Sequence, residues 1–239
     1  MVPNQIGVDI VGATSLDGLS ALSALKQLDR LGITGGNIND LTELKSMKFI
    51  SRLVLNDVPA RDLGPVGSLL HLRELTLMGL PNRPIDISPL KTLVNLEKLT
   101  ILQFVIGDLF ALRGMTSLRY LDLTGSPVAD LSPLNEVRTL AEVSIDQRSV
   151  PGLSALTSST LTTLHIQNSY ARADSVDLTP LAGLRHLKIL EIKACGTLEL
   201  SPLRHLANLT ELTITGTCVA WPRGSPQNRP VGVTSKPAS

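Results

Sequence analysis

LFALRGMTSLRYLDLTGSPVAD, residues 109–130, is the segment that decides the fold of this chain. Its aliphatic side chains are Leu109, Leu112, Met115, Leu118, Leu121, Leu123 and Val128. The early steps of three residues suit a short 3₁₀ or α turn, whereas the step of two between Leu121 and Leu123 suits a strand with alternating faces. The segment therefore predicts one short helical arc followed by one short strand.

The same spacing recurs along most of the 239 residues. Equivalent segments start at Leu19, Leu41, Leu63, Ile87, Leu109, Leu131, Leu153, Leu178 and Leu200. Most starts are 22 residues apart, and two intervals are longer, at 24 and 25 residues. One such segment cannot bury its own leucines, so consecutive segments must stack, which aligns the strands and joins the leucines into a continuous core. We therefore predict an α/β repeat solenoid, with a curved parallel sheet on the concave face and short 3₁₀ or α arcs on the convex face.

The repeats divide the chain into three regions. Residues 1–18 contain a partial N-terminal repeat or cap, because Val11, Leu16 and Leu19 copy the spacing of a later bend. Residues 19–221 contain about nine repeats and predict one elongated domain. Residues 222–239 are rich in Pro, Gly and Ser, and this composition predicts a disordered tail.

Start signals precede the helical arcs. Ser or Thr follows the first aliphatic residue of most repeats, and proline comes next in four of them, as at Ser88 and Pro89. This order predicts a hydroxyl cap followed by proline at the first helical position. Aspartates lie just before these starts, at Asp40, Asp62, Asp86, Asp108, Asp130 and Asp177. We interpret them as structural, because a carboxylate there can satisfy free amides or favour the positive end of the arc.

The composition argues against nucleic acid and membrane as partners. The net charge is +1 and charged residues make up 18% of the chain, so no broad basic field is available to neutralise phosphates. One group of cationic residues on neighbouring arcs is interpreted as a solvated convex edge: Arg185, His186, Lys188, Arg204 and His205. Polar residues interrupt the leucines throughout, which argues against a membrane-inserted span.

The first residues bear on the cellular compartment. They lack a basic start and an unbroken apolar run, so we find no secretory signal and expect a cytoplasmic protein. Cys195 and Cys218 lie about one repeat apart and could form a bridge, but reduced thiols are favoured in that compartment. The glycosylation sequon Asn208-Leu209-Thr210 is accordingly interpreted as a coincidence.

Motifs that carry chemistry are absent from the sequence. It contains no phosphate-binding loop, no nucleophile elbow, no H-E-x-x-H and no C-x-x-C, so we expect no cofactor and no small-molecule substrate. On the open face of the strands, Asp122, His165 and Glu191 could converge with Asp146 on a metal ion. Ser144 lies on the strand between those of Asp122 and His165, so a simple His165–Glu191 pair is the favoured interpretation.

Apolar residues at strand positions that the core does not use predict an interface with a protein partner. Val54, Met78, Leu102 and Tyr120 lie on the open face or its margins in four consecutive repeats. Exposed aromatic and large aliphatic side chains tend to mark interfaces, although these four could also just cover one another. The candidate partner-binding residues are Val54, Met78, Leu102, Tyr120, Asp122, Asp146, His165 and Glu191. Phe104, by contrast, has the offset of a buried bend and is assigned to the core.

Two insertions account for the longer repeats. They are PNRP, at residues 81–84, and NSYARADS, at residues 168–175. Loops grafted on a repeating scaffold often carry recognition. We therefore expect Tyr170 and Arg172, in the second insertion, to be worth testing for partner contacts.

The motifs LSPL, NLEKLTI, LTGSPVADLSPL and NLTELTITGTCV resemble the 22-residue class of leucine-rich repeats found in bacterial internalins and in a eukaryotic protein-phosphatase regulatory subunit. The resemblance covers about Leu19 to Val219. In that class the concave strand face typically binds another protein. The resemblance thus implies a non-enzymatic recognition module that uses strand residues between Val54 and Glu191.

The TG-S/T bends also look similar to repeats at the C-terminal end of bacterial NACHT-type signalling ATPases. In those proteins the repeats are thought to act as the sensor half of a larger chain. This second resemblance implies an alternative function, a sensor fragment of such an ATPase. A metal-dependent enzyme built on Asp122, His165 and Glu191 is the remote third alternative.

Overall fold

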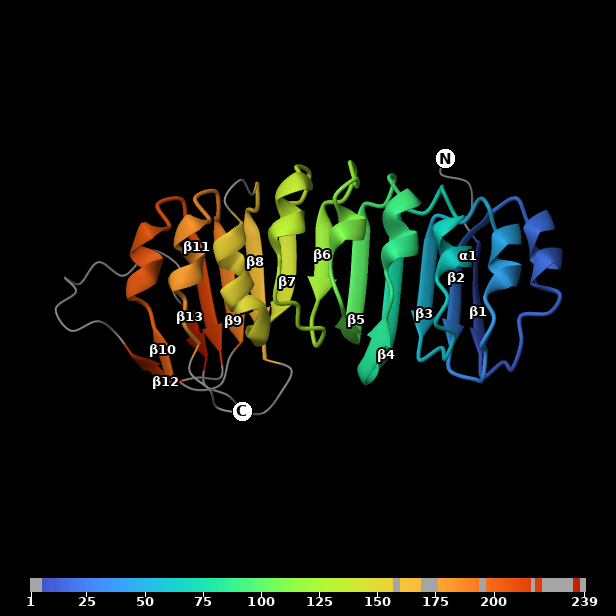
Figure 1. Ribbon diagram of the computed structural model, residues 1–239, viewed down its shortest axis with the longest axis horizontal. Coiled ribbons are helices and arrows are strands. Elements are labelled where there is room, and N and C mark those ends of the chain that lie inside the picture. Colours follow the sequence, from blue (N-terminus) through green and yellow to red (C-terminus); the bar gives the residue numbers. More distant parts are fainter. Residues whose placement is uncertain are drawn as a thin grey trace. The chain divides into compact units, whose positions relative to one another are not determined.

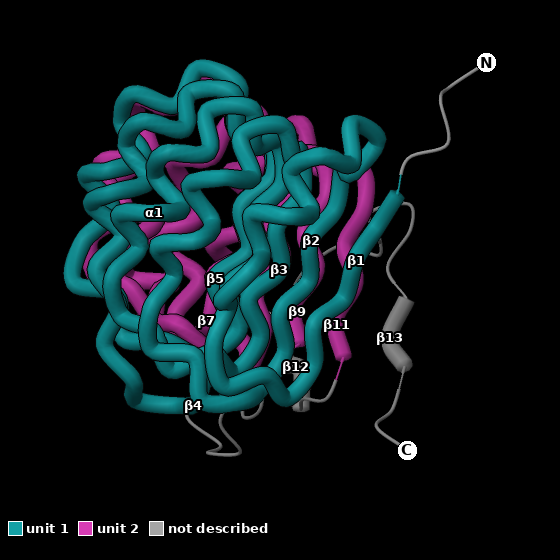
Figure 2. The backbone as a smooth tube through the Cα atoms, turned by 90° about the vertical axis from the view of Figure 1, so that its right-hand side faces the viewer, with its two compact units in different colours: residues 1–120 teal, residues 121–239 magenta. Residues whose placement is uncertain are grey.

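The computed structural model describes residues 6–156, 160–168, 176–193, 197–215, 218–220 and 234–236. It divides into two compact units, which we call unit 1, residues 1–120, and unit 2, residues 121–239 (Figure 2). Tyr170, Arg172 and Cys195 lie outside the described residues, and so does the side chain of Cys218.

Unit 1 contains five parallel strands joined by short helices (Figure 1). The strands are β1 (Ile6–Val11), β2 (Leu28–Thr34), β3 (Arg52–Asn56), β4 (Glu74–Ile85) and β5 (Lys98–Ile106). The helices are η1 (Leu19–Ala24), η2 (Thr42–Ser46), α1 (Gly64–Gly67), η3 (Ser88–Thr92) and η4 (Phe110–Leu112), all 3₁₀ except α1. Each strand pairs with the next in the chain, and α1 lies on the opposite side of the coil from β1, β2 and β3 (Figure 2).

Unit 2 repeats this arrangement. Its strands are β6 (Tyr120–Leu123, which begins at the last residue of unit 1), β7 (Glu142–Asp146), β8 (Thr163–Gln167), β9 (Ile189–Lys193), β10 (Thr197–Glu199), β11 (Glu211–Thr215), β12 (Cys218–Ala220) and β13 (Thr234–Lys236). Its 3₁₀ helices are η5 (Ser132–Glu136), η6 (Gln147–Ala155), η7 (Thr179–Gly183) and η8 (Ser201–His205). Parallel pairs join β7 to β8, β8 to β9, β9 to β11 and β11 to β13, while β10 pairs with β12 in a small second sheet.

The leucines fill the interior of each unit as their spacing predicts. On β4, Leu75 and Leu77 point inward and are buried, and on the following helical arc Leu90 and Leu93 are buried as well. The step of two therefore belongs to strands and the steps of three to 3₁₀ turns, as predicted. The buried aliphatic side chains of one coil rest on those of the next, so burial depends on stacking rather than on any single repeat.

The helix caps differ from the prediction of a hydroxyl cap. The aliphatic residue itself occupies the N-cap position, as Ile87 does for η3, and its side chain makes no cap hydrogen bond. The preceding aspartate supplies the bond instead: the Ser88 amide donates to Asp86 Oδ1 at 2.8 Å. Equivalent amide bonds are accepted by Asp40, Asp62, Asp108, Asp130 and Asp177. The hydroxyl cap is wrong because a carboxylate two residues earlier already reaches the free amide, whereas the structural interpretation of the aspartates is confirmed.

These hydrogen bonds stabilise the charged carboxylates. The pKa of Asp86 is lowered from its ordinary value of 3.8, mainly by the bond from the Ser88 amide and then by the Ser88 hydroxyl. The pKa values of Asp40 and Asp177 are lowered too, chiefly by the hydroxyls of Thr42 and Thr179 and then by the amides of the same residues. The Ser and Thr hydroxyls thus support the aspartate rather than cap the helix.

The PNRP insertion is part of a strand, contrary to the prediction of a loop. Strand β4 runs on to Ile85, and its register against β5 shifts between Met78 and Arg83, where Asn82 has a positive φ of 67°. The extra residues are therefore absorbed as a bulge. Beside it the ring of Phe104 is buried, as predicted, and lies over Gly79, where an added Cβ would meet a ring carbon at 2.4 Å.

Candidate functional site

The open face is the side of each sheet that points away from the helices, and in unit 1 its side chains form three columns across the strands. The register places Arg30, Arg52, Glu74 and Lys98 in the first column, Gly32, Val54, Thr76 and Thr100 in the second, and Thr34, Asn56, Met78 and Leu102 in the third. Alternate residues of each strand are buried in the core, and the columns hold the residues between them, of which Gly32 and Thr100 are also buried.

Met78 and Leu102 are the apolar neighbours on this face. They are register partners on β4 and β5, and Met78 is 37% exposed while Leu102 is half-buried. Val54 is half-buried in the neighbouring column, where its register partner is Thr76. The four predicted apolar residues therefore do not make one continuous strip, because they occupy three different columns.

Tyr120 lies beside a cation rather than beside Leu102. The ammonium Nζ of Lys98 lies 4.6 Å from the centre of the Tyr120 ring, which is a cation–π distance. The other cations of the first column are paired with carboxylates: Arg30 with Asp9 at 2.5 Å and Arg52 with Asp29 at 2.6 Å. The first column of unit 1 is thus polar, and the second column separates it from the Met78–Leu102 pair.

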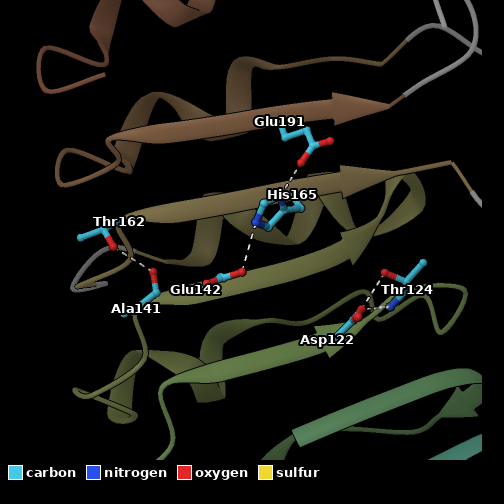
Figure 3. Close-up of polar contacts among 7 residues, drawn as sticks. All are labelled: Asp122, Thr124, Ala141, Glu142, Thr162, His165 and Glu191. Atoms are coloured by element: carbon cyan, nitrogen blue, oxygen red, sulfur yellow. Dashed lines mark hydrogen bonds and ion pairs between the residues drawn. The ribbon is translucent and has the colours of Figure 1, made fainter. Parts of the chain in front are cut away.

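In unit 2 the open face carries a histidine between two glutamates (Figure 3). His165 Nδ1 lies 2.8 Å from Glu191 Oε2 on β9, and His165 Nε2 lies 3.2 Å from Glu142 Oε1 on β7. The predicted His165–Glu191 pair is confirmed, and Glu142 is a third member that is not among the predicted residues. The histidine side chain is 20% exposed. Since a neutral imidazole carries one N–H and a carboxylate accepts, both contacts are hydrogen bonds only when His165 is protonated.

Asp122 and Asp146 do not join this cluster. Asp122 Oδ1 accepts bonds from the amide and hydroxyl of Thr124, at 2.9 and 2.6 Å, and lies apart from His165 (Figure 3). Asp146 is 1% exposed and caps η6 by accepting from the Arg148 amide at 3.0 Å. The prediction that Asp146 contacts a partner is therefore wrong, because a helix starts directly after β7 and turns the carboxylate inward.

The metal-site alternative gains no support from the part of the chain that the structure describes. Within it, no group of three or more His, Cys, Asp or Glu side chains is placed to hold a metal ion. Also within the described residues, no helix is both long and apolar enough to cross a bilayer.

Two residues of the predicted convex edge in unit 2, Arg185 and His205, line a shallow hollow of about 480 Å³ together with Ala182, Ala207 and Asn208. Asn208 Nδ2 donates to the Arg185 carbonyl oxygen at 2.6 Å. The side chain of the sequon asparagine thus joins two neighbouring coils.

Comparison with known proteins identifies the fold. No family model matches the sequence, and no curated protein matches it. Among solved structures, an internalin C2 of Listeria monocytogenes matches with a TM-score of 0.57 and 27% identity, over 85% of this chain and 76% of that one. Another L. monocytogenes internalin, inlF, matches with a TM-score of 0.60 and 21% identity, over 96% and 72%.

The chain has the leucine-rich repeat fold. The fold is shared with more distant structures, among them the plant peptide hormone receptor RGFR1 in complex with RGF2, with a TM-score of 0.55 at 16% identity over 89% of this chain and 35% of that one. The mouse RP105/MD-1 complex matches with a TM-score of 0.56 at 16% identity, over 88% and 42%. The predicted leucine-rich repeat class and its likeness to internalins are confirmed.

Glu142 could have been found from the leucine-rich repeat itself. It occupies the first open-face column, two residues before Ser144, and the register sets it beside Thr163 on the neighbouring strand. The prediction of open-face residues rests on the central column, between the two buried strand positions. Extending the period-two alternation by one step to each side would have included Glu142.

Proposed function

We propose that this leucine-rich repeat protein is a non-enzymatic recognition module that binds a protein partner through the open face of its sheets. Hydrogen-bonded parallel strands fix the backbone beneath every open-face side chain, so little ordering is needed on binding. Fold relatives support the proposal, since two of the matched structures are complexes, one of RGFR1 with RGF2 and one of RP105 with MD-1.

The observation that carries the proposal is the Met78–Leu102 pair in unit 1. Both residues lie where side chains are free of the core, and Met78 exposes more than a third of its surface. Large apolar side chains at exposed and rigid positions are the usual centre of a protein interface, and methionine adapts to irregular partner surfaces. Half-buried Val54 and the Lys98–Tyr120 pair lie on the same open face and extend the proposed contact area.

In unit 2 the cluster of Glu142, His165 and Glu191 supplies polar contacts for the same kind of partner. The two glutamate side chains are 42% and 40% exposed, so each keeps acceptor capacity directed to solvent. Rim groups of this kind set specificity and association rate more than affinity. Asp122, half-buried and held by Thr124, lies on the same open face and completes the set that we retain from the sequence analysis.

The test is quantitative capture of partners by the full chain and by two variants. The double variant Met78→Asp, Leu102→Asp should reduce the recovery of a specific partner by about tenfold or more, since it places charges in the apolar centre of the interface. Phe110→Asp is the matched control, because Phe110 is equally large, 52% exposed and located on a helical arc. Both variants should keep the native circular dichroism spectrum.

Loss of the partner in the Phe110 variant, with full retention in the double variant, would overturn the assignment to the open face. The alternative function, a sensor portion of a signalling ATPase, stays a prediction with its own test. A phosphate-binding loop encoded in the same reading frame upstream would favour it.

A further inference from the structure

A second exposed apolar surface lies in unit 1, away from the open face, at the bends that lead from helix into strand. Phe49 is 74% exposed in the bend after η2, Leu70 is 53% exposed in the bend after α1, and Val94 is 44% exposed in the bend after η3. Together with His71 we call these residues the bend strip. Single exposed apolar side chains are common on folded chains, whereas a group of neighbouring ones tends to mark an interaction surface.

The bend strip is continuous across three coils. Phe49 and His71 occupy the same position of successive repeats, and their rings lie 5.8 Å apart at 49°. Leu70 and Val94 occupy the preceding position of their own repeats, 24 residues apart because of the PNRP insertion. Neighbouring repeats stack in register, so equivalent positions form columns at the bends as they do on the strands.

Hydrogen bonds hold the bends beneath these side chains. His71 Nδ1 lies 3.0 Å from the carbonyl oxygen of Lys48, which can only accept, so Nδ1 is the donor. Asn95 Nδ2 donates to the carbonyl oxygen of Leu70 at 2.9 Å. Each bond joins one coil to the next, so the apolar side chains project from a fixed backbone rather than from a loose loop.

The repeat itself does not require apolar residues here. In other coils the positions equivalent to Leu70 and His71 hold polar or small residues, as in Thr116-Ser117, Arg138-Thr139 and Ala207-Asn208. These coils stack equally well, since their buried leucines are as fully enclosed as those of unit 1. The scaffold therefore gives no structural reason for Phe49, Leu70 and Val94.

Lysines surround the bend strip. Lys26 and Lys48 continue the column of Leu70 and Val94, and Lys91 lies in the last turn of η3, three residues before Val94. All three lysines are exposed, and within the described residues none of them forms an ion pair. The nearby Glu97 is already paired with Arg73. The surface is thus apolar in the middle and positive at its border.

We propose that the bend strip is a second docking surface, which takes an acidic amphipathic segment of a protein partner. Apolar side chains of the segment cover Phe49, Leu70 and Val94, and its carboxylates meet Lys26, Lys48 and Lys91. Charge complementarity of this kind orients the segment and speeds its capture, while burial of the apolar side chains supplies most of the affinity. The surface is separate from the open face, so a partner could be held by both.

The test uses the full chain and a synthetic, fluorescently labelled peptide that carries Leu and Glu at helical spacing. Fluorescence anisotropy should detect binding, and Phe49→Ser with Leu70→Ser should weaken it by about tenfold or more. Lys48→Glu should weaken it as well, and added salt should do the same. Phe110→Ser is the matched control, and the open-face variant Met78→Asp, Leu102→Asp should bind the peptide like the unmodified chain, which separates this proposal from the previous one.

Three further measurements distinguish the acidic segment from a basic segment, a lipid surface and a second copy of the chain. A peptide with Lys in place of Glu should not bind, and vesicles of phosphatidylcholine and phosphatidylserine should not be retained through the bend strip. Sedimentation should show the same mass for the chain and for its Phe49→Ser, Leu70→Ser variant. The proposal is overturned if the acidic peptide does not bind, if the Ser variant binds it unchanged, or if that variant instead loses vesicle binding or self-association.

Discussion

The two units contain the same repeat but differ in which apolar side chains are exposed and which polar side chains are buried. Among the described residues, every exposed large apolar side chain belongs to unit 1: Ile6, Val11, Leu25, Phe49, Leu70, Met78, Leu80, Val94, Val105 and Phe110. The buried polar side chains show the opposite distribution, since Ser126, Ser144, Asp146 and Ser149 lie in unit 2 and Thr100 alone lies in unit 1.

This difference teaches which positions the repeat fixes and which it leaves free. The leucine positions are buried alike in both units, as Leu99 and Leu190 illustrate. Most open-face and bend positions lie outside the core, so they can be apolar in one unit and polar in the other without disturbing the stack. In such a fold, the residues that vary between coils are therefore the ones that can determine which partner is bound.

The largest expected effect comes from the positions that the units share. Leu99→Ala in unit 1 and Leu190→Ala in unit 2 remove fully buried side chains from equivalent strand positions. Each should lower the free energy of unfolding by about 2 to 5 kcal/mol, through lost burial and the cavity left behind. Urea denaturation measures this. A loss below about 1 kcal/mol in one unit alone would break the claim that the two cores are equivalent.

The next effect concerns the packing under the apolar side of unit 1. A Cβ at Gly79 would meet three atoms of the Phe104 ring at 2.4 to 2.8 Å, so Gly79→Ala should cost about 1 to 3 kcal/mol through overpacking. Gly107→Ala is the matched control, because nothing lies within 4 Å of a Cβ there. Thermal unfolding of the two variants compares them directly, and equal melting temperatures would contradict the described contact.

A smaller effect is expected from the buried polar groups of unit 2. Ser149 Oγ accepts a hydrogen bond from the buried Val128 amide at 2.9 Å. Ser149→Ala leaves that amide without its acceptor and should cost at least about 1 kcal/mol. Ser154→Ala, in the same helix, removes an exposed hydroxyl that bonds to Pro151 and should cost less. If chemical denaturation shows the same loss in the free energy of unfolding for both variants, the buried hydrogen bond of Ser149 is not specifically stabilising.

The smallest expected effect is common to both units and depends on pH. The pKa values of Asp86 in unit 1 and Asp177 in unit 2 lie below 3.8, so the charged forms favour the folded state. Their contribution is fully present above pH 3.8 and is lost as the pH falls through the lowered values. Asp86→Asn and Asp177→Asn keep an acceptor oxygen but lose the charge. Each should lower the melting temperature slightly at neutral pH, where the contribution of the carboxylate is fully present, and should flatten the pH dependence of the melting temperature below pH 3.8.

The sequence was sufficient to predict the fold because the spacing of the leucines determines which residues of each coil are buried, and this in turn determines the geometry of the coil. It also predicted the His165–Glu191 pair and the burial of Phe104. The leucine period did not predict the orientation of side chains that form local hydrogen bonds. Asp146 has the spacing of an open-face residue, yet η6 begins directly after β7. The Asp146 carboxylate therefore turns inward and caps η6 by accepting a hydrogen bond from the Arg148 amide.

The bend residues were missed for a related reason. Phe49 and Leu70 follow the buried position at the end of each arc, and the leucine pattern gives no indication of which way they point. Only the stacked coils show them exposed and adjacent. The PNRP insertion was misassigned because a bulge within a strand and a loop between elements contain the same kinds of residue.

Hydroxyl-radical footprinting with a captured partner tests the central claim most directly, because it reports the exposure of individual side chains. Binding through the open face predicts that Met78 and Leu102 in unit 1 and His165 in unit 2 become protected, while Phe110 on its helical arc is oxidised as in the free protein. Protection of Phe110 with unchanged oxidation of Met78, Leu102 and His165 would contradict the account.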